Sequence, residues 1–238
     1  GIFQRSAFLD MAFIGSILLL LYIFFQLMYI LIFAKVSIIS TSNLLFLLIF
    51  CLVLNTVLFI SSFKEEKMII VAHRRNTIQS LRDTPTHLGV EMDIRSYGSE
   101  LIVHHEPFVQ GENFLDWVDE YRHSLLILNV KEEGLEERIL KEVIQRGIKD
   151  FFFLDQSFPF LIKTAFGGEK RCALRVSEYE CLDTAINLSG KVDWVWVDCF
   201  SKLPIDRAQY KRLKNSGFKV CLVSPELQGR KAGMGIRE

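Results

Sequence analysis

The sequence predicts an α/β protein whose parallel sheet or barrel follows two membrane-spanning helices. Two observations lead to this fold class. Between Met11 and Phe63 the only charged residue is Lys35, whereas almost all other charged side chains lie beyond Phe63. From Met68 onward, short apolar runs alternate with amphipathic stretches, which is the pattern of alternating strands and helices. The chain therefore divides into a membrane region, residues 1–66, and an α/β domain, residues 67–238.

Overall composition excludes one class of partner. The 238 residues include 28 basic and 28 acidic side chains, so the net charge is zero with neutral histidines. A nucleic-acid-binding protein is expected to carry a basic excess or a basic patch, and no such bias is present. The five cysteines show no C-x-x-C spacing and are expected to be buried free thiols.

Two apolar runs, residues 11–34 and 43–63, are the predicted transmembrane helices. The first is about 24 residues long and the second lies in an uncharged stretch of about 28, so each exceeds the roughly 20 residues that cross a bilayer. A signal peptide is the alternative for the first run. The apolar stretch of a signal peptide, however, spans only roughly 7–15 residues, and a small-x-small cleavage site follows that stretch. Neither feature matches this chain, so a multi-pass membrane protein is expected.

Charges flanking the two runs predict the side of the membrane. A two-span hairpin places both ends of the chain on one side. Lys64, Lys67, Arg74 and Arg75 follow the second run, whereas the connecting loop offers only Lys35. The positive-inside rule therefore favours a cytoplasmic α/β domain.

Within the domain, each expected strand is a short run rich in Val, Ile, Leu or Phe. The expected strands are residues 68–72, 89–95, 125–130, 151–154, 172–176, 194–197 and 218–223. Amphipathic stretches of helical period separate them. The expected helices are residues 77–82, 135–145, 160–166, 182–188 and 206–215.

The extended piece at residues 101–104 is expected to be an excursion from the loop after the second strand. Only the turn Tyr97-Gly98-Ser99 joins it to that strand, and a parallel crossover needs about a dozen residues or more. The remaining strands are one fewer than the eight of a complete barrel, and the domain's length of about 170 residues is below the roughly 200–250 expected. We therefore predict an incomplete, C-terminally truncated barrel that lacks its eighth strand; a shorter open sheet is the alternative.

Polar residues gather at the predicted strand ends between residues 68 and 107, a stretch that holds four of the five histidines. His73 comes directly after the first strand. Glu91 and Asp93 lie two apart in the second strand, so their side chains point to the same face and can hold a hard cation together. His105 follows the extended piece that returns toward them. These residues predict an active site.

The order of these residues resembles the glycerophosphodiester phosphodiesterase family, whose pattern is H-R-G, N-T, E-x-D and H-D-P. The matching residues here are His73-Arg74-Arg75, Asn76-Thr77, Glu91-Met92-Asp93 and His105-Glu106-Pro107. The resemblance implies a TIM-type (β/α) barrel, a divalent cation held by acidic residues at strand ends, and two histidines that act as general acid and base on a phosphodiester.

Several positions depart from the family pattern. Arg75 replaces the glycine, Glu106 replaces the aspartate, and the loop before Asn76 is contracted. The E-x-K of the family's next strand reads Asn129-Val130-Lys131, which places a neutral amide where a glutamate is usual. Hard cations accept amide oxygens, but a set with less negative charge is expected to bind the metal more weakly.

The resemblance implies a role for each matched residue. His73 and His105 are the expected catalytic pair, and Arg74 and Lys131 the expected phosphate-binding residues. Glu91, Asp93 and Asn129 are the expected ligands of Mg²⁺ or Ca²⁺. Further candidates to line the pocket, or to pair structurally, are Asp155, Arg175, Glu178, Trp196, Asp198 and Glu226.

Together these expectations describe a membrane-anchored, divalent-metal-dependent phosphodiester hydrolase whose substrate is a glycerophosphodiester or a phospholipid-type molecule. The sequence leaves open which histidine is the acid and which the base, and whether water or a substrate hydroxyl attacks the phosphorus. The expected partners are the lipid membrane and the phosphodiester substrate. The alternative is a non-catalytic, degenerate barrel that binds phosphate head groups at the membrane.

Overall fold

The computed structural model describes residues 49–50, 53 and 68–229. The chain divides into two units, Gly1–Lys67 and Met68–Glu238. Apart from residues 49–50 and 53, the predicted membrane spans at residues 11–34 and 43–63 lie outside the described residues. Within those described ranges, no helix is both long enough and apolar enough to cross a membrane.

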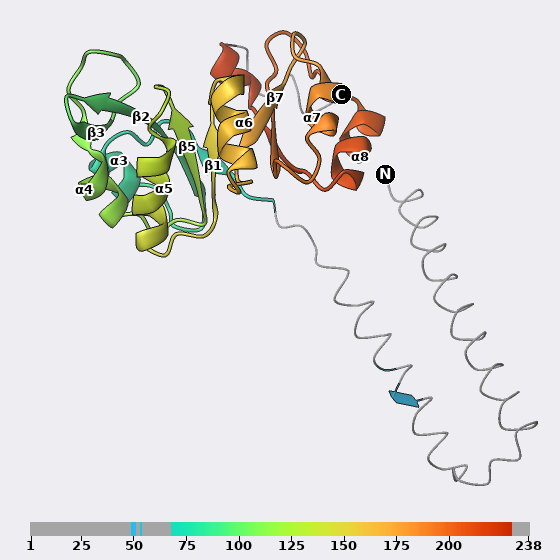
Figure 1. Cartoon of the computed structure of the whole chain (residues 1–238), viewed down its shortest axis with the longest axis horizontal. Helices are drawn as coiled ribbons and strands as arrows, with labels where there is room; N and C mark the ends of the chain where they lie inside the picture. Colours follow the sequence, from blue (N-terminus) through green and yellow to red (C-terminus); the bar gives the residue numbers. More distant parts are fainter. Residues whose placement is uncertain (1–48, 51–52, 54–67, 230–238) are drawn as a thin grey trace, which may run out of the picture. The chain divides into compact units, whose positions relative to one another are not determined.

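The α/β domain is built on parallel strands that follow one another in chain order (Figure 1). They are β1 (Val71–Ala72), β2 (Gly89–Tyr97), β5 (Leu125–Val130), β6 (Phe151–Leu154), β7 (Ala173–Val176), β8 (Trp194–Val197) and β9 (Lys219–Leu222). Strands β1, β2, β5 and β6 form one sheet and β7, β8 and β9 a second, and a parallel bridge between Phe153 and Cys172 connects the two. The predicted α/β class is confirmed, and every predicted strand overlaps an observed one.

Strand β3 (Glu100–Val103) runs antiparallel to β2, and β4 (Glu112–Asn113) runs antiparallel to β3. The predicted excursion after the second strand is therefore confirmed. Gly98 closes the turn with φ of 62°, a left-handed conformation that glycine adopts without a steric cost. The hairpin returns the chain to the level of Asp93, whose carbonyl accepts the backbone N–H of His104 at 3.0 Å.

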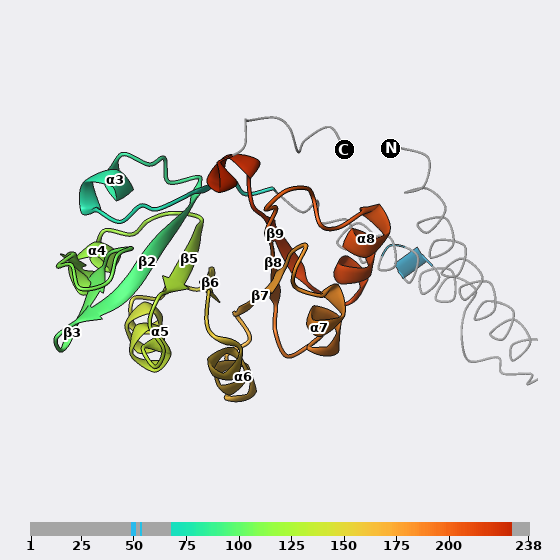
Figure 2. The ribbon, with the colours of Figure 1, turned by 90° about the horizontal axis from the view of Figure 1, so that it is seen from above.

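Helices follow the parallel strands. They are α3 (Ile78–Arg82), α4 (Phe114–Asp119), α5 (Glu136–Gln145), α6 (Phe158–Phe166), α7 (Leu182–Asn187), α8 (Arg207–Asn215) and the 3₁₀ helix η1 (Pro225–Gln228). Figure 2 shows α5, α6 and α7 on the same side of the strands. Helix α6 begins two residues before its predicted start because Pro159 falls in its first turn, where a missing N–H costs nothing. The pattern does not predict the short helix α4.

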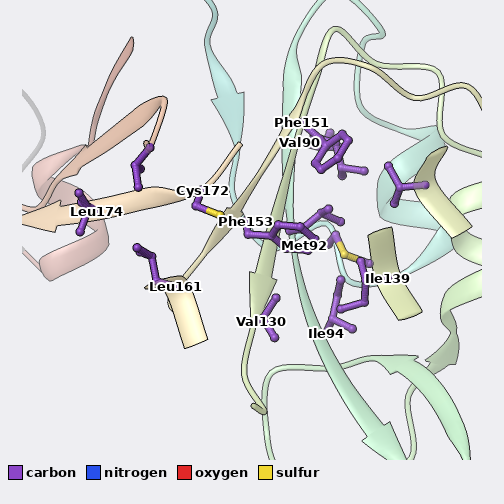
Figure 3. Packing of buried hydrophobic residues seen from close by; sticks show 14 of the residues in the cluster. Val90, Met92, Ile94, Val130, Ile139, Phe151, Phe153, Leu161, Cys172 and Leu174 are labelled. Atoms are coloured by element: carbon purple, nitrogen blue, oxygen red, sulfur yellow. The ribbon is translucent and has the colours of Figure 1, made fainter. Parts of the chain in front are cut away.

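The alternation of side chains along β2 separates the core from the site. Val90, Met92 and Ile94 are fully buried in the main apolar cluster, which also contains residues of the surrounding helices. Figure 3 shows part of this cluster, including Met92 on β2 and Ile139 on α5. Successive side chains of a strand point to opposite faces, so Glu91 and Asp93 project from the other face.

A smaller apolar cluster lies on that other face. It contains Ile127, Phe152, Leu154 and Trp196, together with neighbouring residues of the same strands. In the described part of the chain, β1 pairs only with β2 and β9 pairs only with β8. That the domain is a barrel lacking its eighth strand stays a prediction.

Candidate active site

A pocket of about 240 Å³ lies at the carboxyl ends of the parallel strands. The lining residues lie in or after strands from β1 at one end of the domain to β9 at the other, and η1 adds two more. The two sheets together therefore curve far enough for the first and last strands to contribute to one site. These residues are His73, Arg74, Glu91, Asp93, Asn129, Lys131, Leu154, Asp155, Arg175, Trp196, Asp198, Val223, Leu227 and Gln228.

Glu91 is the most constrained carboxylate in the pocket. Its side chain is only 1% exposed, and its Oε2 accepts the backbone N–H of Arg74 at 2.7 Å. The Asn129 amide donates to its Oε1 at 2.8 Å, and Nε2 of His73 lies 3.6 Å from Oε2. Burial, and after it the negative charge of Asp93, raises the pKa of Glu91. A carboxylate in this position gains from a nearby positive charge.

Arg74 adopts a left-handed backbone conformation, with φ of 53°. Residues other than glycine rarely adopt this conformation, and it costs roughly 1–3 kcal/mol where it is not relieved. The hydrogen bond from its N–H to Glu91 accompanies the conformation. The turn directs the Arg74 guanidinium to His105, whose Nε2 lies 2.9 Å from Nη2.

Asp93 and Asn129 are direct neighbours in the parallel register of β2 and β5. Asn76 holds Asp93 by two hydrogen bonds: its amide donates to Oδ2 at 2.7 Å and its oxygen accepts the Asp93 N–H at 2.9 Å. Oδ1 of Asp93 and Oδ1 of Asn129 are buried without a hydrogen-bond partner. Lys131 Nζ is 3.5 Å from Oδ1 of Asp93.

The two unpartnered oxygens test whether the residues present fit a metal ion. Buried acceptors normally have a partner, and a hard cation binds carboxylate and amide oxygens. Together with Glu91, the oxygens of Asp93 and Asn129 therefore fit Mg²⁺ or Ca²⁺. No cluster of three or more His, Cys, Asp or Glu side chains suited to a metal is found among the described residues, so a site here depends on the amide.

The two histidines come from different elements of the fold. His73 follows β1, and His105 follows the β2–β3 hairpin and is also anchored by Arg95, whose Nε donates to the His105 carbonyl at 2.9 Å. Both imidazoles have 34% of their side-chain surface exposed. Burial, and after it the positive charge of Arg74, lowers the pKa of His73. Its neutral form is therefore favoured.

An ion-pair chain crosses the other half of the pocket. Lys131 Nζ lies 2.9 Å from Asp155, which also forms a hydrogen-bonded ion pair with Arg175. Arg175 also donates a hydrogen bond to Asp198 at 2.9 Å, and Gln228 donates to Asp198 at 2.7 Å. Burial opposes the ionisation of Asp155, but Arg175 and Lys131 outweigh it and lower its pKa.

The pattern at the strand ends placed Arg175 and Asp198 among the candidates without indicating their contacts. The sequence match also included Asn76 without a role, and the structure reveals its contact with Asp93. Trp196 lines the pocket and is 9% exposed.

Glu178 lies outside this pocket. Its carboxylate accepts the backbone N–H groups of Ser201 and Lys202 at 2.6 and 2.8 Å and that of Phe200 at 3.2 Å. It lines a cavity of about 370 Å³ beside the loop after β7. We place the candidate site in the smaller pocket, since that pocket contains the imidazole, the guanidinium and the buried carboxylates. Glu226 lines neither cavity.

Comparisons with known proteins add a likeness of structure. No family model and no curated protein sequence matches the chain. Among solved structures, the chain is similar to a glycerophosphodiester phosphodiesterase from Agrobacterium tumefaciens str. C58, with a TM-score of 0.49 and 11% sequence identity. The likeness covers 65% of this chain and 86% of that one. At this level of similarity, it assigns no role to any residue of this chain.

Proposed function

We propose that the chain is a membrane-anchored, divalent-metal-dependent phosphodiester hydrolase with a TIM-type barrel, acting on a glycerophosphodiester or a phospholipid-type substrate. The observation that carries this proposal is the composition of one pocket. His73, Arg74, Glu91 and Asp93 line it together, and His105 contacts Arg74 at its edge. Proton transfer, anion binding and cation binding are the three tasks of phosphodiester hydrolysis, and this set of side chains suits all three.

Proton transfer falls to His73 and His105. Imidazole titrates close to neutral pH, and each ring is partly exposed, so a substrate can reach it. One histidine removes a proton from the attacking water or substrate hydroxyl, and the other protonates the departing oxygen. Both lie beside Arg74, since His73 precedes it in the chain and His105 contacts its guanidinium.

Anion binding falls to Arg74 and Lys131. A guanidinium presents a planar set of donors that matches phosphoryl oxygens. In the structure, Arg74 donates to His105 Nε2, so a bound phosphate would compete for the same guanidinium and release that nitrogen. Lys131 lies between Asp93 and Asp155 and would offset part of the phosphate charge.

Cation binding falls to Glu91, Asp93 and Asn129, because Oδ1 of each of the last two residues is buried without a hydrogen bond. The Lys131 ammonium, 3.5 Å from Oδ1 of Asp93, would have to share that oxygen with the cation. When bound, Mg²⁺ or Ca²⁺ would act as a Lewis acid and would orient a phosphate oxygen. Asn76 and Arg74 hold the two carboxylates in place through the bonds described above. The neutral amide of Asn129 leaves the set with less charge than three carboxylates would have.

The predicted spans at residues 11–34 and 43–63 supply the membrane anchor in this proposal. They would keep the domain at a lipid surface, on the cytoplasmic side by the distribution of basic residues. Proximity to lipid favours a glycerophospholipid or lysolipid as the substrate over a freely diffusing phosphodiester.

A second candidate function is a non-catalytic barrel that binds phosphate head groups. Two observations favour it: the Asn129 amide is engaged by Glu91, and Lys131 is engaged by Asp155. The first contact occupies an oxygen of Glu91 that would hold the cation, and the second occupies the ammonium of Lys131. The two functions differ in whether a phosphodiester is consumed.

The deciding experiment measures hydrolysis of bis(p-nitrophenyl) phosphate and a panel of phospholipids by the full chain in detergent, with Mg²⁺, with Ca²⁺ and with a chelator. His73→Ala and His105→Ala are each expected to lower the rate by about 10²- to 10⁴-fold, the usual contribution of a general acid or base. His87→Ala is the matched control, since His87 is exposed and lies outside the pocket. Head-group binding without turnover in the wild type would favour the second candidate instead.

A further inference from the structure

His105 and Glu106 form a side-chain pair beside Arg74, a residue that lines the pocket. Nδ1 of the imidazole lies 2.6 Å from Oε1 of the neighbouring carboxylate. This separation is slightly shorter than the usual range of about 2.7–3.2 Å for a nitrogen–oxygen hydrogen bond, and hydrogen bonds shorten when one partner is ionised. The hydrogen bond to His105 lowers the pKa of Glu106, so its carboxylate is charged at neutral pH.

The other ring nitrogen of His105 indicates which tautomer is present. Its Nε2 lies 2.9 Å from Nη2 of Arg74, and a guanidinium can only donate. Nε2 therefore accepts a hydrogen bond, which leaves the ring proton on Nδ1. A carboxylate can only accept, so the contact with Glu106 requires the same tautomer. Two independent contacts thus agree.

The turn that presents this pair is held by its own contacts. The Glu106 N–H donates to Nδ1 of His104 at 3.0 Å, and Arg95 holds the His105 carbonyl. Gly111 packs so closely beneath the turn that a Cβ there would clash with the carbonyl oxygen of Val103. Glu106 therefore has little freedom to leave His105 by backbone movement.

We propose that Glu106 is a positioning residue for His105. It holds the imidazole as the Nδ1–H tautomer, so that Nε2 is the atom through which His105 gains and loses a proton during the reaction. When Nε2 is protonated, the carboxylate of Glu106 stabilises the resulting imidazolium, as a carboxylate does in other acid–base dyads. This inference rests on the proposed hydrolase function.

The two ring nitrogens of His105 face groups of opposite charge. The guanidinium of Arg74 faces Nε2. Glu106 carries the compensating negative charge on the opposite side of the ring. Arg74 also supports the Nδ1–H tautomer in the empty pocket, but a bound phosphate would draw its guanidinium away. Glu106 is then the contact that keeps His105 in the Nδ1–H tautomer.

The experiment uses the full chain in detergent, with ¹⁵N-labelled histidine rings, and reads the tautomer of His105 by NMR. Arg74→Gln removes one of the two contacts, and the Nδ1–H tautomer is expected to persist because Glu106 remains. In Arg74→Gln combined with Glu106→Ala, both tautomers are expected. Glu106→Asp is expected to keep the Nδ1–H form, and Glu120→Ala is the control, an exposed glutamate paired with Arg82 away from the pocket.

Kinetics provide the second readout. Glu106→Ala is expected to lower kcat by about 10- to 100-fold with little change in KM, a size typical of losing a partner that orients a catalytic or metal-binding histidine. Glu106→Asp should recover much of that loss. The proposal is overturned if the double variant keeps the Nδ1–H tautomer or if Glu106→Ala has the wild-type kcat. If the wild type hydrolyses no phosphodiester, the tautomer result still decides the positioning claim, and only the proposed function fails.

Discussion

At the scale of single residues, Asn129 is where a small chemical change is expected to have the largest effect. Its amide donates to Glu91, while its own oxygen is buried without a hydrogen bond. At the candidate metal position, the Asn129 NH₂ group is hydrogen-bonded and the Asn129 oxygen is not. A carboxylate there would lose the donor and gain a charged ligand.

Asn129→Glu is therefore expected to tighten the binding of Mg²⁺ or Ca²⁺ and to destabilise the metal-free protein. Added ligand charge lowers the dissociation constant for a hard cation, whereas three adjacent buried carboxylates repel one another when no cation is present. Metal titrations of melting temperature, for wild type and variant, test both effects. Asn129→Asp is the control, because it adds the charge at nearly unchanged volume. A lowered melting temperature that metal does not recover would contradict the assignment.

His73 is expected to be neutral at pH 7 for two separable reasons, burial and the charge of Arg74. Arg74→Gln removes only the second, so the His73 pKa is expected to rise but to remain below its ordinary value of about 6.5. NMR titration of the ring measures it. Arg82→Gln is the control, since Arg82 pairs with Glu120 outside the pocket. An unchanged His73 pKa in Arg74→Gln would show that the guanidinium does not act on this ring.

At the scale of elements, the β2–β3 hairpin brings the second histidine to the first. Strand β2 runs on past the level where β5 ends, and β3 returns beside it with Val103 opposite Ile94. The next residues are His104 and His105, so the register of one hairpin decides where the imidazole lies. A slip by one residue would direct it to the opposite face.

The loops after β7 and β8 are joined through Glu178, whose carboxylate accepts three backbone N–H groups of the second loop. Burial opposes its ionisation, but the N–H groups of Lys202 and Ser201 outweigh burial and lower the pKa of Glu178 to about 2. The sign of the pH effect follows. The pKa of a glutamate in the unfolded chain is about 4.3. Because the pKa of Glu178 is lower in the folded protein, its carboxylate stabilises the fold fully above about pH 4.3, and this stabilisation is lost as the pH falls toward 2.

Glu178→Gln is therefore expected to melt at a lower temperature than wild type at pH 6, with the difference shrinking between about pH 4.3 and pH 2. Thermal melts at several pH values, followed by circular dichroism, measure it. Glu133→Gln is the control, because Glu133 is exposed in the loop after β5. A difference that stays constant across this range would mean that the carboxylate charge is not what stabilises the loops.

At the scale of the whole molecule, the division into Gly1–Lys67 and Met68–Glu238 leads to a direct test of the membrane anchor. A chain that begins at Lys64 is expected to enter the aqueous phase in detergent phase separation, whereas the full chain is expected in the detergent phase. The reason is that both long uncharged runs precede Lys64. Recovery of the shortened chain in the detergent phase would place a lipid-binding surface in the α/β domain.

The sequence by itself determined the order of the elements and the positions of the polar residues along them. Strands of a parallel sheet are buried on both faces, so each appears locally as a short apolar run, as in β5 and β6. The two-residue spacing of Glu91 and Asp93 determined their common face, because alternation along a strand is also a local property. The sequence pattern missed helix α4 because a helix of six residues is too short to show a helical period. The N-cap residue Asn113 was the remaining local signal of this helix.

Only the tertiary structure decided which of these residues touch. The contact of Asn129 with Glu91 joins positions 38 apart in the chain, and that of Arg74 with His105 joins positions 31 apart. The engagement of Lys131 by Asp155 likewise depends on how neighbouring strands are placed. Strand register, sheet curvature and loop conformation set these distances, and each results from packing over the whole domain. The sequence alone therefore indicated which groups could perform the chemistry, and the fold decided how they are paired.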